Sequence, residues 1–259
     1  MITKNQIKFI HSLALKKYRD RNNVFLAEGP KAVADLLPHY ECELLLTTPD
    51  CDIHADIPRE KICEVSQSEL ERASLMPAPR KTLAVFRRLE PLCAKKVLDD
   101  CPADELILAL DGIQDAGNLG TIIRTANWFG IRYILASEDT VDVYSPKVVQ
   151  ATMGAMAKVQ VVYANLHEVF SDNQGKRPTY GTFLDRSSCL YDTSLQKGGI
   201  LLMGNEGKGI CSALETFVTD RLFIPYYPTH VTPVAESLNV AVATALACAE
   251  FRRQAREKK

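Results

Sequence analysis

The sequence predicts an α/β protein with two domains, and three observations support this prediction. At 259 residues the chain is long enough for one large domain or two of ordinary size. Apolar runs typical of buried strands alternate with patterns of helical spacing, which predicts sheets covered by helices. At Leu106 the pattern changes, because a strand of continuous apolar residues begins there. We therefore expect a small N-terminal α/β domain and a larger domain with a mostly parallel sheet and helices on both faces.

The N-terminal part of the chain alternates helices and strands. Ile7, Ile10 and Leu13 recur at helical spacing with Lys and Arg between them, which predicts the first helix. The predicted helices span residues 3–21, 31–37 and 68–73, and the predicted strands span 24–28, 42–48, 62–65 and 82–88. Together they predict one domain over residues 1–92.

Prolines and acidic residues separate the two parts. Pro91, Pro102, Asp99-Asp100 and Asp104-Glu105 precede Leu106, so we expect a linker at residues 93–104 that can contain a helical turn. Residues 105–259 form the second predicted domain. Its predicted strands span 106–110, 133–136, 160–163, 180–184, 199–203 and 221–224, and its predicted helices span 121–129, 147–157, 166–170 and 237–253.

The composition is typical of a soluble globular protein, with 46% hydrophobic and 24% charged residues. No apolar run approaches the roughly 20 residues needed to span a bilayer. The first residues lack the apolar core of a signal peptide. We therefore expect a cytoplasmic protein. The net charge of −1 does not by itself indicate a nucleic-acid partner.

Positive charge is nevertheless concentrated near both ends of the chain. Lys17, Arg19 and Arg21 lie in the first predicted helix, and Arg252 and Arg253 lie in the last. Such patches bind RNA phosphates. Solvated helix faces carry the same charges, so charge alone leaves both interpretations open.

The eight cysteines and five histidines do not indicate a metal site. The sequence has no Cys-x-x-Cys pair, and the five histidines form no cluster. Disulfides are not expected in a reducing compartment. We expect most cysteines to be small buried apolar residues.

Three glycines follow the predicted strand 199–203, in the run Met203-Gly-Asn-Glu-Gly-Lys-Gly209. Glycine permits a positive φ angle and a close approach of the backbone to a ligand. The run matches neither the G-x-x-x-x-G-K-[ST] nor the G-x-G-x-x-G motif. A loop that offers backbone groups to a nucleoside is therefore favoured over a phosphate-binding loop, and an ordinary tight connection is the alternative.

The run from Asp111 to Gly130 places Asn118 just after a strand and Arg124 in the helix that follows. Apolar residues flank Arg124, so we expect this arginine to be buried and therefore paired or functional. A structural ion pair, for instance with Glu206, is the alternative.

A third run ends a strand at Ile224-Pro225 and resumes at Ser237-Leu-Asn-Val240. Ser237 or Asn239 can cap the final helix. That helix is dense in small residues, which permits close packing in a core or across a dimer interface.

In this order the three runs resemble the signature motifs of the SpoU/TrmH family of RNA ribose 2′-O-methyltransferases, in the SPOUT superfamily. The resemblance covers residues 105–253, and Ser145–Gly154 is similar to the segment that follows the first motif in rRNA methyltransferases of this family. Residues 17–21 and 24–29 resemble the ribosomal-protein-like RNA-binding domain that these enzymes often carry. The resemblance implies a trefoil-knotted α/β domain, S-adenosylmethionine as cofactor, structured RNA as substrate and a homodimer formed through the knotted domain.

The resemblance also implies roles for individual residues. The residues implied to hold S-adenosylmethionine, chiefly through backbone groups, are Thr182, Phe183, Leu184, Gly204, Ile224, Leu238 and Asn239. The residues implied at the catalytic centre are Asn118, Arg124, Glu206, Ser237 and Asn239. In the N-terminal domain, Lys17, Arg19 and Arg21 are expected to bind RNA, and no metal is needed.

The implied reaction is an in-line attack of a ribose 2′-hydroxyl on the sulfonium methyl group. A free hydroxyl is a poor nucleophile and must lose its proton during transfer. The family proposal is that Arg124 takes or relays this proton, with Asn118, Glu206 and Asn239 orienting Arg124 and the ribose. Arginine is almost always protonated, so Arg124 as a base and Arg124 as a positioner both stay open.

Two departures from the family pattern bear on the pocket. Ala116 stands where the family usually has proline, and residues 226–236 form a longer stretch without glycine. The two-domain layout favours rRNA as the substrate. A tRNA methyltransferase, a non-catalytic RNA-binding homologue and an unrelated nucleotide-binding α/β domain are the alternatives.

Overall fold

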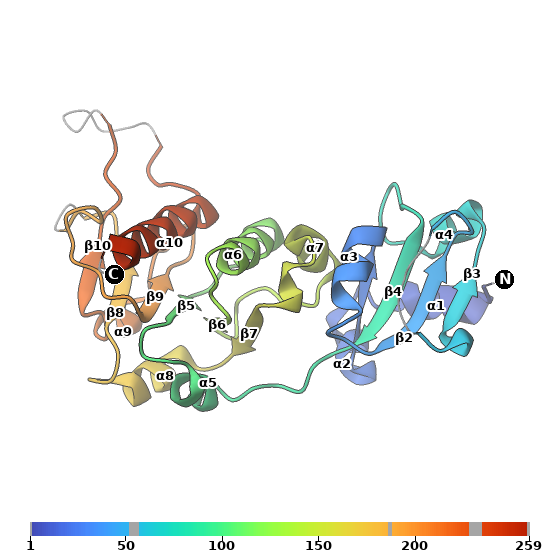
Figure 1. Ribbon diagram of the computed structural model, residues 1–259, viewed down its shortest axis with the longest axis horizontal. Coiled ribbons are helices and arrows are strands. Elements are labelled where there is room, and N and C mark those ends of the chain that lie inside the picture. The colour runs from blue at the N-terminus through green and yellow to red at the C-terminus, as the bar shows by residue number, and fades with distance from the viewer. Residues whose placement is uncertain (1, 52–56, 186–187, 228–234, 258–259) are drawn as a thin grey trace. The chain divides into compact units, whose positions relative to one another are not determined.

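The computed structural model describes residues 2–51, 57–185, 188–227 and 235–257, and it divides into two compact units (Figure 1). The first unit combines Met1–Glu90 with Asp142–Ala157. The second combines Pro91–Val141 with Lys158–Lys259. The chain therefore passes between the units after residues 90, 141 and 157, whereas the predicted linker implies a single passage.

A four-stranded sheet in the order β1-β4-β2-β3 forms the centre of the first unit. The outer strand β1 and the inner strand β2 each pair antiparallel with β4, and β3 runs parallel to β2. The prediction of an N-terminal α/β domain is confirmed. The strands are β1 (Val24–Glu28), β2 (Cys42–Thr47), β3 (Ile62–Glu64) and β4 (Thr82–Arg87), and the helices are α1 (Lys4–Ser12), α2 (Lys16–Asn22), α3 (Pro30–Leu36), α4 (Gln67–Ala73) and α7 (Pro146–Thr152).

The single first helix that the sequence predicts is in fact two helices, α1 and α2. Leu13, which continues the helical apolar pattern, is fully buried at the break between them. The Arg19 guanidinium donates hydrogen bonds to the carbonyls of Leu13 (2.7 Å) and Ala14 (2.9 Å), which the break leaves without helical partners. Arg19 therefore compensates for the interruption of the helix.

Residues 142–157, which we call the strap, complete the core of the first unit. The Tyr144 ring lies 4.9 Å from that of Phe25 in β1, measured between ring centroids. The Tyr40 hydroxyl donates to the Met156 carbonyl at 3.2 Å. Helix α7 ends at Thr152, because Met153 (φ +51°) and Gly154 (φ +86°) both adopt the left-handed conformation, so the predicted helix 147–157 is shorter than expected. The strap thus belongs structurally to the first unit, although residues 91–141 separate it from the rest of that unit in the chain.

A six-stranded, wholly parallel sheet in the order β10-β8-β9-β5-β6-β7 forms the second unit. Helices flank this sheet (Figure 1), and the predicted fold class is confirmed. The strands are β5 (Leu106–Leu110), β6 (Tyr133–Ala136), β7 (Gln160–Tyr163), β8 (Thr179–Thr182), β9 (Gly199–Met203) and β10 (Asp220–Leu222), and the helices are α5 (Ala94–Asp100), α6 (Ala116–Trp128), α8 (Leu166–Asn173), α9 (Ser212–Glu215) and α10 (Val240–Glu257). The knot stays a prediction from the family resemblance.

Residues 93–104, the expected linker that can contain a helical turn, belong to the second unit, and helix α5 lies within them. Val97 and Leu98 of this helix are buried in the hydrophobic core of the second unit. The acidic and proline residues that predicted a linker lie on the exposed side of α5 or beyond its end. None of the described helices is long and apolar enough to cross a membrane.

Candidate active site

The loops predicted to hold the cofactor follow three neighbouring strands. In the sheet, β8 lies between β10 and β9. Thr182 at the end of β8 pairs with Leu222, and its hydroxyl lies 3.8 Å from the Met203 sulfur at the end of β9. The carboxyl ends of parallel strands are where open α/β sheets bind ligands. The structure therefore brings the segments of Thr182–Leu184, Gly204 and Ile224 to one edge of the sheet.

This edge offers both backbone groups and apolar side chains to a ligand. Among the described residues, neither Gly204 nor Ile224 has a hydrogen-bond partner for its backbone N–H or carbonyl. Leu184 is 66% exposed and Leu238 is 49% exposed. Unpaired backbone groups beside exposed apolar side chains suit a nucleoside, whose base offers polar edges and apolar faces. The residues present thus fit S-adenosylmethionine.

Asn118 is the centre of a hydrogen-bonded group of polar side chains. Its Nδ2 donates to Glu206 Oε1 at 2.7 Å, and its Oδ1 accepts from Asn239 Nδ2 at 2.8 Å. Three segments that are distant in the sequence therefore meet at Asn118. The structure brings together three of the five predicted catalytic residues.

Capping interactions place each member of this group. Helix α6 begins earlier than predicted because Asp115 caps it, with its carboxylate accepting from the Asn118 N–H at 2.8 Å. Asn239 Oδ1 accepts from the N–H groups of Ala241 (3.0 Å) and Val242 (3.3 Å) and so caps α10. Asn239 is therefore both a helix cap and a member of the polar group. Asp115 has no part in the predicted site, although its position three residues before Asn118 is a recognisable capping signal.

Arg124 does not join this group, and the prediction that it is buried is wrong. Its side chain is exposed, and it makes no hydrogen bond or ion pair with any described residue. Ile122, Ile123 and Ala126 are buried around it, but Arg124 lies on the opposite, solvent side of α6. The alternative of an ion pair with Glu206 is therefore excluded, and so is the expectation that Glu206 orients Arg124.

The remaining predicted catalytic residue, Ser237, is exposed next to Asn239. It makes no hydrogen bond with the described residues. Most of the long stretch at 226–236, which bears on the shape of the pocket, lies outside the described residues. Ala116, the residue that replaces the family's proline, is the first residue of α6, a position where proline and alanine are both tolerated.

The three residues predicted to bind RNA differ in exposure. Lys17 and Arg21 are exposed on α2. Arg19 is 2% exposed, and besides its two carbonyl partners it forms an ion pair with Asp142 of the strap, with Nη2 and Oδ2 at 2.7 Å. Four of its five N–H donors are taken and the side chain is 3% exposed, so no donor is accessible to a phosphate. The prediction that Arg19 binds RNA is therefore wrong.

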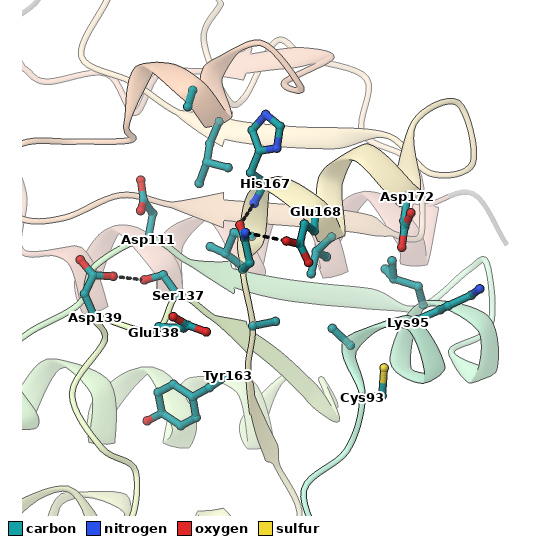
Figure 2. A pocket seen from close by; sticks show the side chains of 18 of the residues that line it. Cys93, Lys95, Asp111, Ser137, Glu138, Asp139, Tyr163, His167, Glu168 and Asp172 are labelled. Carbon is teal, nitrogen blue, oxygen red and sulfur yellow. Dashed lines mark hydrogen bonds between the residues drawn. The ribbon is translucent and has the colours of Figure 1, made fainter.

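A cavity of about 760 Å³ lies at the other half of the same sheet, beyond β5, β6 and β7 (Figure 2). None of the predicted catalytic or cofactor residues lines it. Its carboxylates repel phosphate groups, so it does not suit the RNA substrate. The acidic residues that line it are Asp111, Glu138, Asp139, Glu168 and Asp172.

No group of side chains in the described part of the chain is suited to hold a metal ion. All eight cysteines are free thiols, and three of them, Cys42, Cys101 and Cys248, are buried. Burial raises the pKa of the Cys248 thiol to about 12. This thiol is therefore protonated and inert at neutral pH.

Two family models match the chain, over separate stretches of the sequence. The SpoU rRNA methylase family matches residues 105–249, and an MRM3-like substrate-binding domain matches residues 4–84. The 23S rRNA (guanosine(2553)-2′-O)-methyltransferase RlmP of Bacillus subtilis is 30% identical over 248 residues, which cover 94% of each chain.

Solved structures give the same result over the whole chain. A putative RNA methyltransferase of the TrmH family from Porphyromonas gingivalis is 40% identical, with a TM-score of 0.84 and coverage of 98% of this chain and 99% of that one. The AdoMet-bound rRNA methyltransferase of Sinorhizobium meliloti is 28% identical, with a TM-score of 0.83 and coverage of 98% and 96%. The prediction made from the three motifs is confirmed: the chain belongs to the SpoU rRNA methylase family.

Proposed function

We propose that this protein transfers the methyl group of S-adenosylmethionine to a ribose 2′-hydroxyl of ribosomal RNA. The observation that carries the proposal is the hydrogen-bonded group of Asn118, Glu206 and Asn239 beside the cofactor edge of the sheet. The relatives point to a guanosine of 23S rRNA as the substrate, because the Bacillus subtilis enzyme is named for that reaction. Lys17 and Arg21 supply positive charge for the RNA backbone.

Glu206 and Asn239 have different roles in the proposed reaction. S-adenosylmethionine, when bound, supplies an electrophilic methyl group whose bond to sulfur breaks as its bond to the ribose oxygen forms. Glu206 has one carboxylate oxygen held by Asn118 and a second with no partner among the described residues. This second oxygen offers an acceptor for the proton of the 2′-hydroxyl. Asn239, held by Asn118 and by α10, keeps one amide hydrogen for the ribose.

Arg124 acts as a positioner in this proposal. A guanidinium has five N–H donors and no acceptor, and that of Arg124 is exposed without an internal partner. It is therefore suited to hold a phosphate of the target nucleotide close to the polar group. Proximity and orientation can supply about 7–11 kcal/mol in favourable cases, so no strongly basic group is required.

The second unit also carries an apolar surface that suits a homodimer. Trp128 at the end of α6 is 86% exposed, and Val242 and Leu246, one turn apart on α10, are 49% and 36% exposed. Helices α6 and α10 pack against each other. We propose that a second copy of the chain covers these side chains. Light scattering of the purified protein tests this, since Trp128→Glu should convert dimer into monomer. A cytoplasmic location stays a prediction.

The activity itself is tested with labelled S-adenosylmethionine and 23S rRNA that lacks its ribose modifications. We expect label in a 2′-O-methylated nucleotide of this RNA. Label only in tRNA would replace rRNA by tRNA as the substrate. Cofactor binding without labelling of any RNA would support the non-catalytic alternative and overturn the proposal.

A further inference from the structure

The side chain of Asn205 joins two loops of the second unit. Its Nδ2 donates to the Gly112 carbonyl at 2.6 Å, in the loop between β5 and α6. Its Oδ1 accepts from the N–H groups of Gly207 (2.9 Å) and Lys208 (3.1 Å), in its own loop. The amide therefore makes one bond outward and two bonds within its loop.

The loop that contains Asn205 is closed on itself and attached at both ends. Asn205 and Gly209 exchange two backbone hydrogen bonds, of 3.0 and 2.9 Å. After the loop, the Cys211 N–H donates to Asp111 Oδ2 at 2.7 Å. Figure 2 shows the Asp111 side chain beside the acidic cavity, on the loop that follows β5. Asn205 is thus hydrogen-bonded to Gly112, and Cys211 is hydrogen-bonded to the preceding residue, Asp111.

Glu206 lies in the sequence between Asn205 and Cys211, and its carboxylate accepts a hydrogen bond from Asn118. Asn118 follows Gly112 by six residues and lies in the first turn of α6. The bond from Asn205 to Gly112 and the bond from Glu206 to Asn118 therefore hold neighbouring residues of one loop against the β5–α6 connection and the helix that follows it. Loss of the first bond removes one of the attachments of the segment that carries the Glu206 carboxylate. A displacement of about 1 Å near a reacting group can reduce a rate by about a hundredfold.

We infer that Asn205 is a positioning residue for methyl transfer, which acts by holding Glu206 against Asn118. The inference rests on the proposed function. Asn205 belongs to none of the predicted catalytic or cofactor sets, and all its side-chain bonds are to protein backbone. It therefore acts through its neighbours, and the hydrogen bond of Glu206 to Asn118 makes Glu206 the neighbour at the polar group.

Two substitutions distinguish the hydrogen bond from Asn205 to Gly112 from the hydrogen bonds that Asn205 accepts within its own loop. Asn205→Ser keeps an oxygen that can accept from Gly207 but loses the donor to Gly112. Asn205→Asp keeps both turn bonds and places an oxygen against the Gly112 carbonyl. We expect both to lower kcat about 10- to 100-fold, with the KM for RNA and the Kd for S-adenosylmethionine changed less than about threefold.

A matched control is available in the same unit. Asn165 caps α8, with Oδ1 accepting from the His167 N–H and Nδ2 donating to Glu168. Asn165→Ser likewise keeps an oxygen that can cap the helix and loses the amide donor, here the bond to Glu168, away from the polar group. It should lower the melting temperature about as much as Asn205→Ser and leave kcat unchanged.

A double-mutant cycle with Glu206→Gln distinguishes positioning from general weakening. If Asn205 acts through Glu206, adding Asn205→Ser to Glu206→Gln should slow the enzyme by less than about twofold further. If the reductions of kcat caused by the two single substitutions multiply in the double variant, the inference is overturned. A kcat of Asn205→Ser within twofold of the wild-type value would overturn it as well. Failure of both Asn205 variants to fold would also overturn it and make Asn205 a folding residue. Full activity of Glu206→Gln on its own would overturn the proposed site, and the inference with it.

Discussion

Arg19 and Arg124 lie on helices of the two units, and they are opposites in almost every respect. Arg19 is 2% exposed, and its donors are taken by Asp142 and by the carbonyls of Leu13 and Ala14. Arg124 is exposed and has no partner among the described residues. The first arginine holds a unit together, and the second is available to a substrate. The comparison shows that an arginine can serve RNA only where the fold leaves its donors unpaired.

The largest expected effect is on activity, from Arg124→Ala. Loss of a residue that places the target nucleotide should reduce kcat/KM by at least about a hundredfold. The melting temperature should stay unchanged, because exposed residues without partners contribute little to stability. Single-turnover methylation assays and thermal unfolding of the same samples check both halves of this prediction. Undiminished activity would remove Arg124 from the reaction.

The second effect is on stability, from Arg19→Met. The substitution leaves Asp142 charged and enclosed, so we expect a loss of about 3–5 kcal/mol in the free energy of unfolding. Chemical denaturation followed by circular dichroism measures this loss. The double variant Arg19→Met with Asp142→Leu should recover part of it, because no unpaired charge remains. Lys31→Met is the control, since the Lys31–Asp35 pair is exposed and should contribute little.

A third effect, on RNA affinity, comes from Lys17 and Arg21. Each alanine substitution should lower the slope of log K against log salt by about one, because one phosphate contact is lost. Filter binding of rRNA fragments at several salt concentrations measures the slope. An unchanged slope would mean that α2 presents only a solvated face.

The smallest expected effect comes from Glu28, a buried charge in the first unit that has no arginine beside it. Burial raises the pKa of Glu28, against the opposing hydrogen bonds from Ser74 and from the Leu75 N–H. The folded state therefore holds this proton more tightly than the unfolded state, and the contribution of Glu28 to stability is lost as the pH rises through the raised pKa.

Glu28→Gln removes this titration. The variant should gain stability relative to wild type between pH 4 and pH 7, as measured by denaturant unfolding at a series of pH values. A stability difference that does not change with pH would show that Glu28 titrates alike in the folded and unfolded states.

The strands of the second unit could be predicted to within about two residues at each end. Continuous apolar runs such as Leu106–Leu110 and Gly199–Met203 are bounded by glycine or charged residues, so the local sequence determines their ends. The family motifs likewise identified Asn118, Glu206 and Asn239 as residues of the catalytic centre, although the sequence does not show the hydrogen bonds between them. These features depend on neighbouring residues or on motif order.

Features that depend on a distant partner could not be predicted in this way. Arg19 is enclosed by Asp142, which is 123 residues away. Asn205 is bound to Gly112 across 93 residues. The exposure of Arg124 was missed for a different reason, because buried neighbours in a helix do not show toward which side the residue itself points.

The strap also constrains how a protein with this architecture can evolve. The strap belongs to the first unit but lies in the sequence between two stretches of the second. Its residues Tyr144 and Met156 contact Phe25 and Tyr40 in the core of the first unit. Exchange of the first ninety residues for another RNA-binding module would leave these side chains without their partners. A new module must therefore arrive together with a matching internal segment.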